Sequence, residues 1–395
     1  MNSETKDVCE ICTNLCSSVL QKTIDNQSVT SDSFYTSTKN SYLFHCSACN
    51  YFFTKTQFEI EDFYSDKYSL LHEDFFQDQI VFLPDGAPIE RNRYQADYIK
   101  NLICNLDIRS ICDIGCGKGL TIKLLSEDLN HLDTFLYDLG QDSYKLLWEK
   151  YIPTTRVLPS LNGVKNRFDL VYSFFVAEHV ENLDSYINTC INLINEDGAF
   201  IACLPDIAQN HGDIFVSDHL RHMSHANLQR YLSNTSLPEF DFKIWADQSL
   251  RALFFAVGKR ETLRSLNVES KDNISNLGEV CRDKILSLWP KNNKTQILNS
   301  IANKDLILWG SQFYGKLAAL TLSLKDVLVV DGNPHFQGTI FSLPNGKKVI
   351  VQGPETLYQN NCKNHVILLC MNDTAATALQ RKLPEEIKAK TITLF

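Results

Sequence analysis

The feature that most constrains the fold is a glycine-rich run, Asp113-Ile-Gly115-Cys-Gly117-Lys-Gly119, between a short apolar segment and a helix-compatible one. Glycine is needed where a chain turns tightly and lets its backbone approach a ligand, because side chains would block both. About 20 residues later a second apolar segment ends at Asp138, whose carboxylate can accept hydrogen bonds from two ribose hydroxyls. The spacing predicts a strand, turn and helix that bind a nucleoside cofactor. A structural turn with an incidental acidic residue and a nicotinamide enzyme are the alternatives.

Short apolar segments alternate with helix-compatible stretches around this turn, which is typical of a mostly parallel sheet with helices on its faces. A helix-compatible segment at 91–106 precedes the first strand. The last strand should be antiparallel and lie at the far edge of the sheet. The predicted strands are 110–114, 134–137, 168–174, 199–204 and 253–258.

The chain has 395 residues, more than one core usually holds, and at about 100–200 residues per domain we expect two or three units. A second alternating series has strands predicted at 305–309, 327–330, 348–351 and 365–370. The sequence therefore predicts an α/β protein in five parts: a cysteine-containing domain at 1–60, an aromatic linker at 61–99, the main α/β domain at 100–260, a helical linker at 261–303 and a smaller α/β domain at 304–395.

The amino-acid composition limits the classes of binding partner that we expect. The 47 acidic residues outnumber the 38 basic ones without a long basic stripe, which argues against a nucleic-acid or anionic-membrane partner and favours a small-molecule substrate. We find no apolar run of about 18 residues and no basic and apolar signal-peptide pattern at the N-terminus, so we expect a cytoplasmic protein without membrane association. The sequence does not indicate an oligomeric state.

Two pairs of cysteines, Cys9 with Cys12 and Cys46 with Cys49, have the C-x2-C spacing that places two thiolates on one cation. Together they predict a tetrahedral four-thiolate Zn²⁺ site, and a redox C-x-x-C is the alternative. Such a closed site has no open position for a substrate, so we expect the metal to support folding rather than catalysis. Cys16 and His45 are possible substitute ligands.

The glycine run, Phe168-Asp169-Leu-Val-Tyr-Ser173 and Ala177-Glu178-His179-Val180 resemble the motifs of class I S-adenosylmethionine (SAM)-dependent methyltransferases. The resemblance implies a Rossmann-like sheet with SAM as the cofactor. It places Asp138 on the ribose, and Asp113 either orienting the turn or touching the amino-acid part of SAM. The methionine and ribose portions would lie along Gly115, Gly117 and Gly119.

The order of the parts, with Asp331-Gly-Asn-Pro334 in the last one, is similar to the three-domain sugar C-methyltransferases, which act on nucleotide-linked deoxy keto sugars. That resemblance implies an N-terminal zinc-binding domain, a C-terminal Rossmann-like domain, and a base that abstracts a proton beside a keto group to give an enolate. The implied catalytic residues are His219 as the general base, His179, Asp218, Tyr64 and Tyr68. The family usually has Glu where this chain has Asp218, and a tyrosine where it has Val216.

Other interpretations of these residues stay open. Asp218 can cap a helix while His222 packs, and the tyrosines can be core residues. The enzyme can be an O- or N-methyltransferase, and a SAM- and zinc-binding interaction protein without catalysis is an alternative of another class. A second turn, Gly310-Ser-Gln-Phe-Tyr-Gly315, has only two glycines, and its aromatic residues would crowd a pyrophosphate. We expect this turn to frame the substrate rather than bind a nicotinamide.

Overall fold

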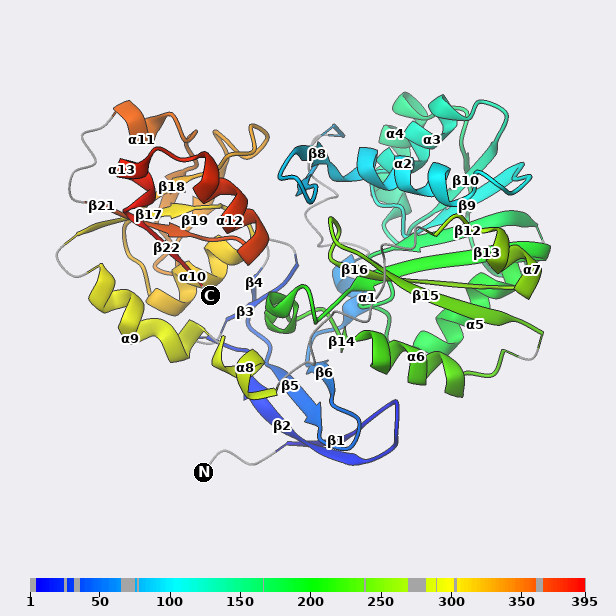
Figure 1. The fold of residues 1–395 in the computed structure, drawn as a ribbon, viewed down its shortest axis with the longest axis horizontal. Coiled ribbons are helices and arrows are strands. Elements are labelled where there is room, and N and C mark those ends of the chain that lie inside the picture. The colour runs from blue at the N-terminus through cyan, green and yellow to red at the C-terminus, as the bar shows by residue number, and fades with distance from the viewer. Residues whose placement is uncertain are drawn as a thin grey trace.

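The computed structural model describes the chain over residues 5–24, 27–31, 36–64, 75–76, 78–165, 167–237, 239–268, 282–288, 290–301, 304–359 and 365–394. Three sheets organise it: a five-stranded sheet near the N-terminus, a seven-stranded sheet in the middle of the chain and a four-stranded sheet toward the C-terminus (Figure 1). In this view the seven-stranded and four-stranded sheets lie on opposite sides, and the five-stranded sheet lies below and between them.

The central sheet has the strand order β11-β10-β9-β12-β13-β16-β15. The strands from β11 to β13 run parallel, and β16 is antiparallel to both of its neighbours. This mixed α/β architecture confirms the predicted fold class. The strands are β9 (Ser110–Ile114), β10 (Asp133–Tyr137), β11 (Arg156–Val157), β12 (Phe168–Phe174), β13 (Ile194–Pro205), β15 (Asp241–Asp247) and β16 (Ala252–Gly258).

One prediction about this sheet is wrong. The segment 253–258 does form an antiparallel strand, β16, but β15 lies outside it and occupies the edge. All seven residues of β16 are buried, because its side chains belong to the apolar cores on both faces of the sheet, and such strands read as continuous apolar runs. In β15 the polar residues Asp241, Lys243 and Asp247 break the apolar pattern, so the sequence did not reveal it.

Helices cover both faces of the central sheet (Figure 1). One apolar core joins the sheet to residues such as Ile99, Ile122 and Trp148, and the core on the other face includes Ile187 and Leu228. The predicted helix at 91–106 ends earlier, at Leu102. These helices are α2 (Arg91–Leu102), α3 (Leu120–Asp128), α4 (Gln141–Tyr151), α5 (Leu183–Leu193), α6 (His225–Asn234) and α7 (Arg260–Ser265).

The N-terminal sheet has the order β1-β2-β5-β6-β14. Its last strand comes from the central part of the chain, since Arg221 and His222 pair with Phe53 and Phe52 of β6. The segment that follows β13 is therefore fixed in position by the N-terminal sheet. The strands are β1 (Lys6–Val8), β2 (Leu15–Gln21), β5 (Ser41–Cys46), β6 (Tyr51–Thr56) and β14 (Arg221–His222).

The C-terminal sheet is parallel, with the order β18-β17-β21-β22. The predicted strand at 348–351 corresponds to β20, which pairs with β19 in a separate hairpin rather than with this sheet. The elements are α9 (Pro290–Ser300), β17 (Asp305–Trp309), α10 (Phe313–Leu322), β18 (Leu328–Val330), β19 (Ile340–Ser342), β20 (Lys348–Ile350), β21 (His365–Leu369), α12 (Asp373–Lys382) and β22 (Thr391–Thr393).

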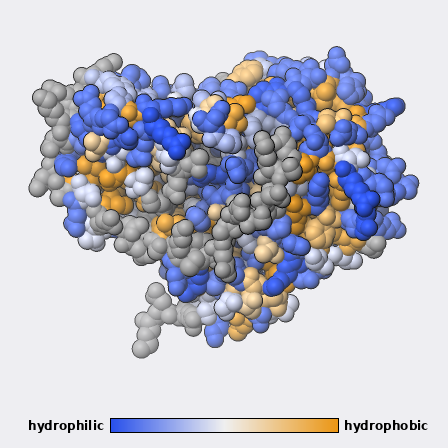
Figure 2. Space-filling view, viewed as in Figure 1, coloured by the Kyte–Doolittle hydropathy of each residue, from blue (hydrophilic) through white to orange (hydrophobic). Residues whose placement is uncertain are grey.

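The remaining elements are short: β3 (Ser28–Val29), β4 (Thr36–Ser37), α1 (Ile60–Asp62), β7 (Ile80–Phe82), β8 (Pro88–Glu90), the 3-10 helix η3 (His211–Phe215), α8 (Arg282–Ser287), α11 (Thr356–Gln359) and α13 (Glu385–Lys388). Among the described residues, none of the helices has the length and apolar character needed to cross a membrane. On the face drawn in Figure 2, hydrophilic and hydrophobic residues are interspersed over both lobes.

Candidate active site

A pocket of about 490 Å³ lies at the carboxyl ends of the central strands. Its lining comes from segments far apart in the sequence: Tyr64 and Arg91 before the central sheet, the run 114–120 and His179 within it, and Phe313 from the C-terminal unit. In open α/β sheets, ligands bind in the crevice outside the carboxyl ends of the strands. The position of the pocket therefore identifies it as the candidate active site.

The glycine run forms the floor of this pocket, and its backbone conformation requires glycine. Gly115 and Gly119 have φ angles of +74° and +76°, in the left-handed region that other residues rarely adopt. A Cβ added to Gly115 would lie 2.3 Å from Cγ2 of Val176. Gly117, between them, also lines the pocket, so the backbone of the turn is open to a ligand.

Asp138 follows β10 and faces the same pocket. Its Oδ2 accepts a hydrogen bond from the backbone N–H of Gly117, and its Oδ1 accepts one from Gly140, each at 2.8 Å. Burial raises the pKa of this carboxyl, and the two backbone donors oppose the rise. A carboxylate has about four acceptor positions, so Asp138 can still accept hydrogen bonds from ribose hydroxyls.

Asp113 lies beneath the turn and is not among the residues that line the pocket. Its Oδ2 accepts a hydrogen bond of 2.7 Å from the hydroxyl of Tyr172 on the neighbouring strand. Burial raises the pKa of Asp113 to about 8. Of the two roles that the resemblance implies, this position suits the one that orients the turn.

At the other end of the pocket, three of the predicted catalytic residues form one hydrogen-bonded group. The hydroxyl of Tyr64 lies 2.7 Å from Nδ1 of His179 and donates to Oδ2 of Asp218 at 2.5 Å. Ser31 holds Asp218 as well, since its N–H donates to Oδ1 at 2.7 Å. Burial, followed by the neighbouring His219, lowers the pKa of His179 to about 4. Tyr64 and His179 line the pocket, and Asp218 lies behind them.

His219 belongs to a second layer of the same wall, and its acidic partner is not the one beside it in sequence. Its Nδ1 lies 2.6 Å from Oδ1 of Asp213, and Nδ1 of His222 lies 2.6 Å from Oδ2 of the same carboxylate. Burial lowers the pKa of His219, but the charge of Asp213 outweighs burial and the pKa rises to about 9. Burial, followed by the charge of Lys22, lowers the pKa of His222 to about 4.

Two of the open interpretations can now be compared with the structure. Asp218 does not cap a helix, because α6 begins at His225 with Ser224 as its N-cap. His222 is buried and its Nε2 lies 2.8 Å from the hydroxyl of Thr54. Tyr68, the second predicted tyrosine, lies outside the described residues.

Sequence reasoning missed Asp213 and Glu178. Asp213 lies in η3, and the sequence around it carries no motif that pairs it with the two histidines. Glu178 was quoted with His179 but given no role. It is 1% exposed, its Oε2 has no hydrogen-bond partner among the described residues, and burial raises its pKa to about 8. An acidic residue directly after the apolar pair Val176 and Ala177 was the only available signal.

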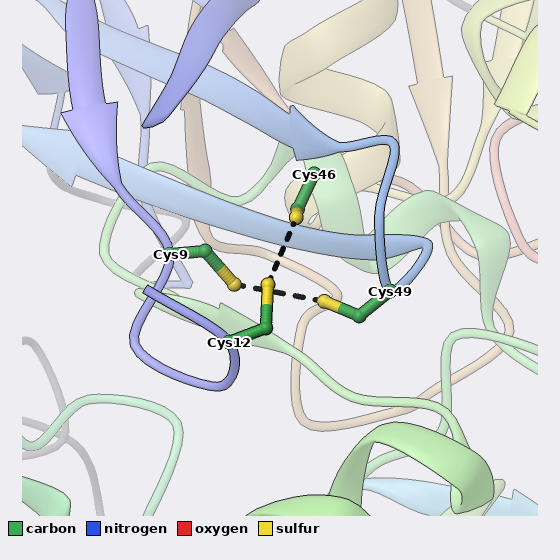
Figure 3. A group of neighbouring side chains, drawn as sticks. All are labelled: Cys9, Cys12, Cys46 and Cys49. Carbon is green, nitrogen blue, oxygen red and sulfur yellow. Dashed lines mark hydrogen bonds between the residues drawn. The ribbon is translucent and has the colours of Figure 1, made fainter. Parts of the chain in front are cut away.

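The four predicted metal ligands meet at one point (Figure 3). The Sγ atoms of Cys9 and Cys49 are 3.6 Å apart, and those of Cys12 and Cys46 are 3.4 Å apart. Thiolates around one tetrahedral Zn²⁺, with Zn–S bonds of about 2.3 Å, are separated by about 3.8 Å. The donor set therefore fits a metal of this kind.

The two possible substitute ligands have other partners. Sγ of Cys16 donates to the backbone carbonyl of Asn14 at 3.4 Å, and Nε2 of His45 lies 2.9 Å from Oδ1 of Asn50. The group of residues able to hold a metal at this place contains the four cysteines and neither of these two.

One family model and several solved structures are similar to part of this chain. Residues 81–243 match the family model described as a methyltransferase domain. No curated protein matches the sequence. The similar solved structures include the plantazolicin methyltransferase BpumL in complex with S-adenosylhomocysteine (SAH) and a pentazolic desmethylPZN analog, at 12% identity over 43% of this chain and 85% of that chain, with a TM-score of 0.37.

Two further solved structures have similar scores. An O-methyltransferase family protein from Burkholderia thailandensis is 10% identical over 42% of this chain and 56% of that chain, with a TM-score of 0.35. A SAM-dependent methyltransferase from Thermotoga maritima, described as a possible histamine N-methyltransferase, is 14% identical over 43% of this chain and 91% of that chain, with a TM-score of 0.33. These likenesses are weak, and the assignment rests on the family match and on the site.

The α/β sheet, the open glycine turn and the acid at the end of the next strand define the class of protein, a class I SAM-dependent methyltransferase. The family match covers residues 81–243, which contain the glycine turn, Asp138 and the parallel strands β9 to β13. The chain is accordingly a SAM-dependent methyltransferase enzyme.

Proposed function

We propose that this enzyme methylates a nucleotide-linked keto sugar at the carbon next to its carbonyl group, using SAM bound along Gly115, Gly117 and Gly119 with its ribose on Asp138. The observation that carries the proposal is the hydrogen-bonded group of Tyr64, His179 and Asp218 at the end of the cofactor pocket. O- or N-methylation requires less: a positioned acceptor and, at most, a weak base.

Transfer to carbon requires removal of a proton and stabilisation of the resulting enolate oxygen. Tyr64 lines the pocket and donates to the ionised Asp218, whose pKa lies below its usual range because His179 and His219 outweigh burial. In the proposed step, the phenol oxygen of Tyr64 takes the substrate proton while its own proton passes to Asp218. The enolate carbon then attacks the methyl group, the carbon–sulfur bond of SAM breaks, and SAH leaves.

His179 then donates a hydrogen bond to the acceptor's oxygen, and His219 packs against His179 without lining the pocket. Their rings are perpendicular, with centroids 4.7 Å apart, and His179 lines the pocket. Asp213 lies 2.6 Å from Nδ1 of His219, and Nε2 of this ring has no hydrogen-bond partner among the described residues. The sequence resemblance gives the proton-accepting role to His219, and this alternative is separated from the Tyr64 step by the variants below.

Aromatic side chains on the C-terminal side of the pocket are available to contact the nucleotide part of the acceptor. Phe313 and Phe336 line the pocket there, with Gln312 between strand β17 and helix α10. Nucleotide bases stack on aromatic side chains, at about 1–3 kcal/mol per base. We propose that this unit, which frames the pocket, contacts the nucleotide.

The four-cysteine cluster is proposed to hold a structural Zn²⁺ that positions the acceptor side of the pocket. Glu10, between two of the cysteines, accepts a hydrogen bond of 2.9 Å from Arg221, and Arg221 also donates to the backbone carbonyl of Glu181 at 3.0 Å. Glu181 lines the pocket. Metal analysis should find one zinc per chain, and Cys12→Ser should lower both the zinc content and the unfolding temperature.

The test of the function uses SAH in place of SAM, a nucleoside-diphosphate keto sugar, and D₂O. We expect deuterium at the carbon next to the carbonyl, with the exchange lost in Tyr64→Phe and slowed but retained in His219→Gln. Exchange that is lost in His219→Gln and retained in Tyr64→Phe would identify His219 as the base. Methyl transfer in a parallel assay with SAM, together with no exchange in the SAH reaction, would instead establish O- or N-methylation. SAM binding without transfer to any acceptor would favour the interaction protein.

A further inference from the structure

We infer that Glu178, His179 and His219 form a binding site for a divalent cation at the acceptor end of the pocket. Each of the three offers a ligand atom, and these atoms all lie within 4.8 Å of one another. Glu178 and His179 come from the loop that follows β12, and His219 from the segment before β14. Two imidazoles and one carboxylate on one side of a cation, with the other positions open, suit Fe²⁺, Mn²⁺, Co²⁺ or Zn²⁺.

The carboxylate of Glu178 is the second observation that points to a ligand. The side chain is 1% exposed, and its Oε2 has no hydrogen-bond partner among the described residues. A buried polar atom without a partner is destabilising, and such atoms are rare in folded proteins. Its Oε1 lies 3.9 Å from Nε2 of His179, too far for a hydrogen bond and suited to a cation between the two groups.

The partners of the two histidines are those that metal-binding histidines have. A metal-bound imidazole usually donates its other ring N–H to a carboxylate or a backbone carbonyl, which fixes the ring. Nδ1 of His219 lies 2.6 Å from the carboxylate of Asp213, and Nδ1 of His179 lies 3.1 Å from the backbone carbonyl of Asp218. Nε2 of His219 is thereby left for the cation, whereas Nε2 of His179 also lies 3.2 Å from the hydroxyl of Tyr64, which the cation would replace as its partner.

The site lies beside the cofactor pocket, because His179 lines the pocket that the glycine turn also lines. An open position of the cation would accept an oxygen of the acceptor, where a divalent ion stabilises developing negative charge. Only this last step rests on the proposed function. Binding of the cation itself depends on the three residues alone.

The donor atoms also separate this site from the four-cysteine cluster. Thiolates prefer soft cations, whereas imidazole and carboxylate groups accept Mn²⁺. Mn²⁺ is therefore the probe. Its binding is measured as the loss of the free Mn²⁺ signal in electron paramagnetic resonance while the full chain is titrated into the Mn²⁺ solution. We expect one Mn²⁺ per chain, with affinity at least about 10-fold weaker in Glu178→Gln and in His219→Gln.

Two controls make the result decisive. Glu61→Gln removes another carboxylate from the pocket lining and should leave Mn²⁺ binding unchanged. SAH affinity, measured calorimetrically on each variant, should stay within about twofold of wild type and shows that the fold and cofactor site are intact. Wild-type protein that binds SAH but no Mn²⁺, or Mn²⁺ binding that survives both ligand substitutions, overturns the cation site and leaves the methyltransferase function in place. Mn²⁺ binding without SAH binding would support the cation site and contradict the methyltransferase function.

Discussion

The chain contains two strand-to-helix turns of similar plan, and only the first is open to a ligand. One follows β9 and the other follows β17, each of which pairs in parallel with a neighbouring strand that is followed directly by an aspartate. In both turns the first glycine donates its N–H to the carbonyl before that aspartate: Gly115 to Tyr137 and Gly310 to Val330, each at 2.8 Å. The backbone plan is thus the same up to the first glycine.

The two turns differ in length and in the hydrogen bonds that the aspartate accepts. Between β17 and α10 there are only three residues, and a Cβ at Gly315 would lie 2.2 Å from the carbonyl oxygen of Gly310, so the helix packs directly on the turn. Ser311 donates both its N–H and its hydroxyl to Oδ2 of Asp331. A cavity of about 40 Å³ beside this turn has room for water and not for a dinucleotide.

The comparison teaches that glycines and an acid at the expected spacing do not suffice for a cofactor site. Asp138 has spare acceptor positions and faces a pocket, whereas Asp331 is buried and engaged by its own turn. The position two residues before the first glycine also differs, with Asp113 in one turn and Leu308 in the other. The next four predictions test this contrast.

The largest effect is expected from Gly115→Val. The substitution places a branched side chain at φ +74° and against Val176, so SAH affinity should fall at least about 100-fold. Gly332→Ala, next to the acid of the second turn, meets only Nε1 of Trp309 at 3.9 Å and should leave SAH affinity unchanged. Equilibrium dialysis with labelled SAH measures both, and retained affinity in Gly115→Val would remove the turn from the cofactor site.

The two acids should respond differently to the same change. Asp138→Asn weakens a charged acceptor for the ribose and should reduce SAH affinity about 10- to 100-fold. Asp331→Asn should leave SAH affinity unchanged and lower the free energy of unfolding by about 1–3 kcal/mol, because it weakens hydrogen bonds from Ser311 and Asn333. Calorimetry and urea unfolding report the two quantities, and an SAH effect from the second acid would contradict the contrast.

The carboxyl beneath the first turn should make stability depend on pH. Folded Asp113 keeps its proton up to about pH 8, whereas the unfolded chain releases it near 3.8. Between these values the folded state binds more protons, so wild-type stability falls as pH rises. Asp113→Asn does not titrate, so the stability advantage of wild type over this variant should shrink by about 3–4 kcal/mol from pH of about 5 to about 8. Urea unfolding at both values tests it, and an advantage that grows with pH would contradict the raised pKa.

The smallest effect concerns the second turn as a frame for the acceptor. Phe313→Ala removes an aromatic wall of the pocket and should raise the KM for the acceptor about three- to tenfold, with SAH affinity unchanged. Steady-state kinetics with the nucleotide sugar gives the KM. A change in SAH affinity alone would show that the second turn contacts the cofactor instead.

The parts of the fold that depend on local sequence could be predicted. The run at 110–114 forms β9 and the run at 168–174 forms β12, because short apolar segments between turns have few other options. The positive φ angles of Gly115 and Gly119 also follow from the need for glycine in a tight turn. Each C-x2-C spacing places two thiolates together, at the turn of the hairpin β1–β2 or of the hairpin β5–β6.

The remainder depends on contacts between distant segments. Nothing near Asp213 in sequence indicates that it lies between two histidines, since η3 and β14 place it there. The insertion of β14 beside β6 joins residues about 170 positions apart, which no periodicity encodes. The burial of Glu178 is likewise set by the walls around it rather than by its neighbours in sequence.

The most direct test of the account is calorimetric titration of the purified full chain with SAH and, separately, with NADH. The open first turn and the closed second turn predict that SAH binds at one site per chain with micromolar affinity and that NADH does not bind. Binding of NADH without SAH would contradict the account, because the second turn would then be the nucleotide site and the chain would be an oxidoreductase.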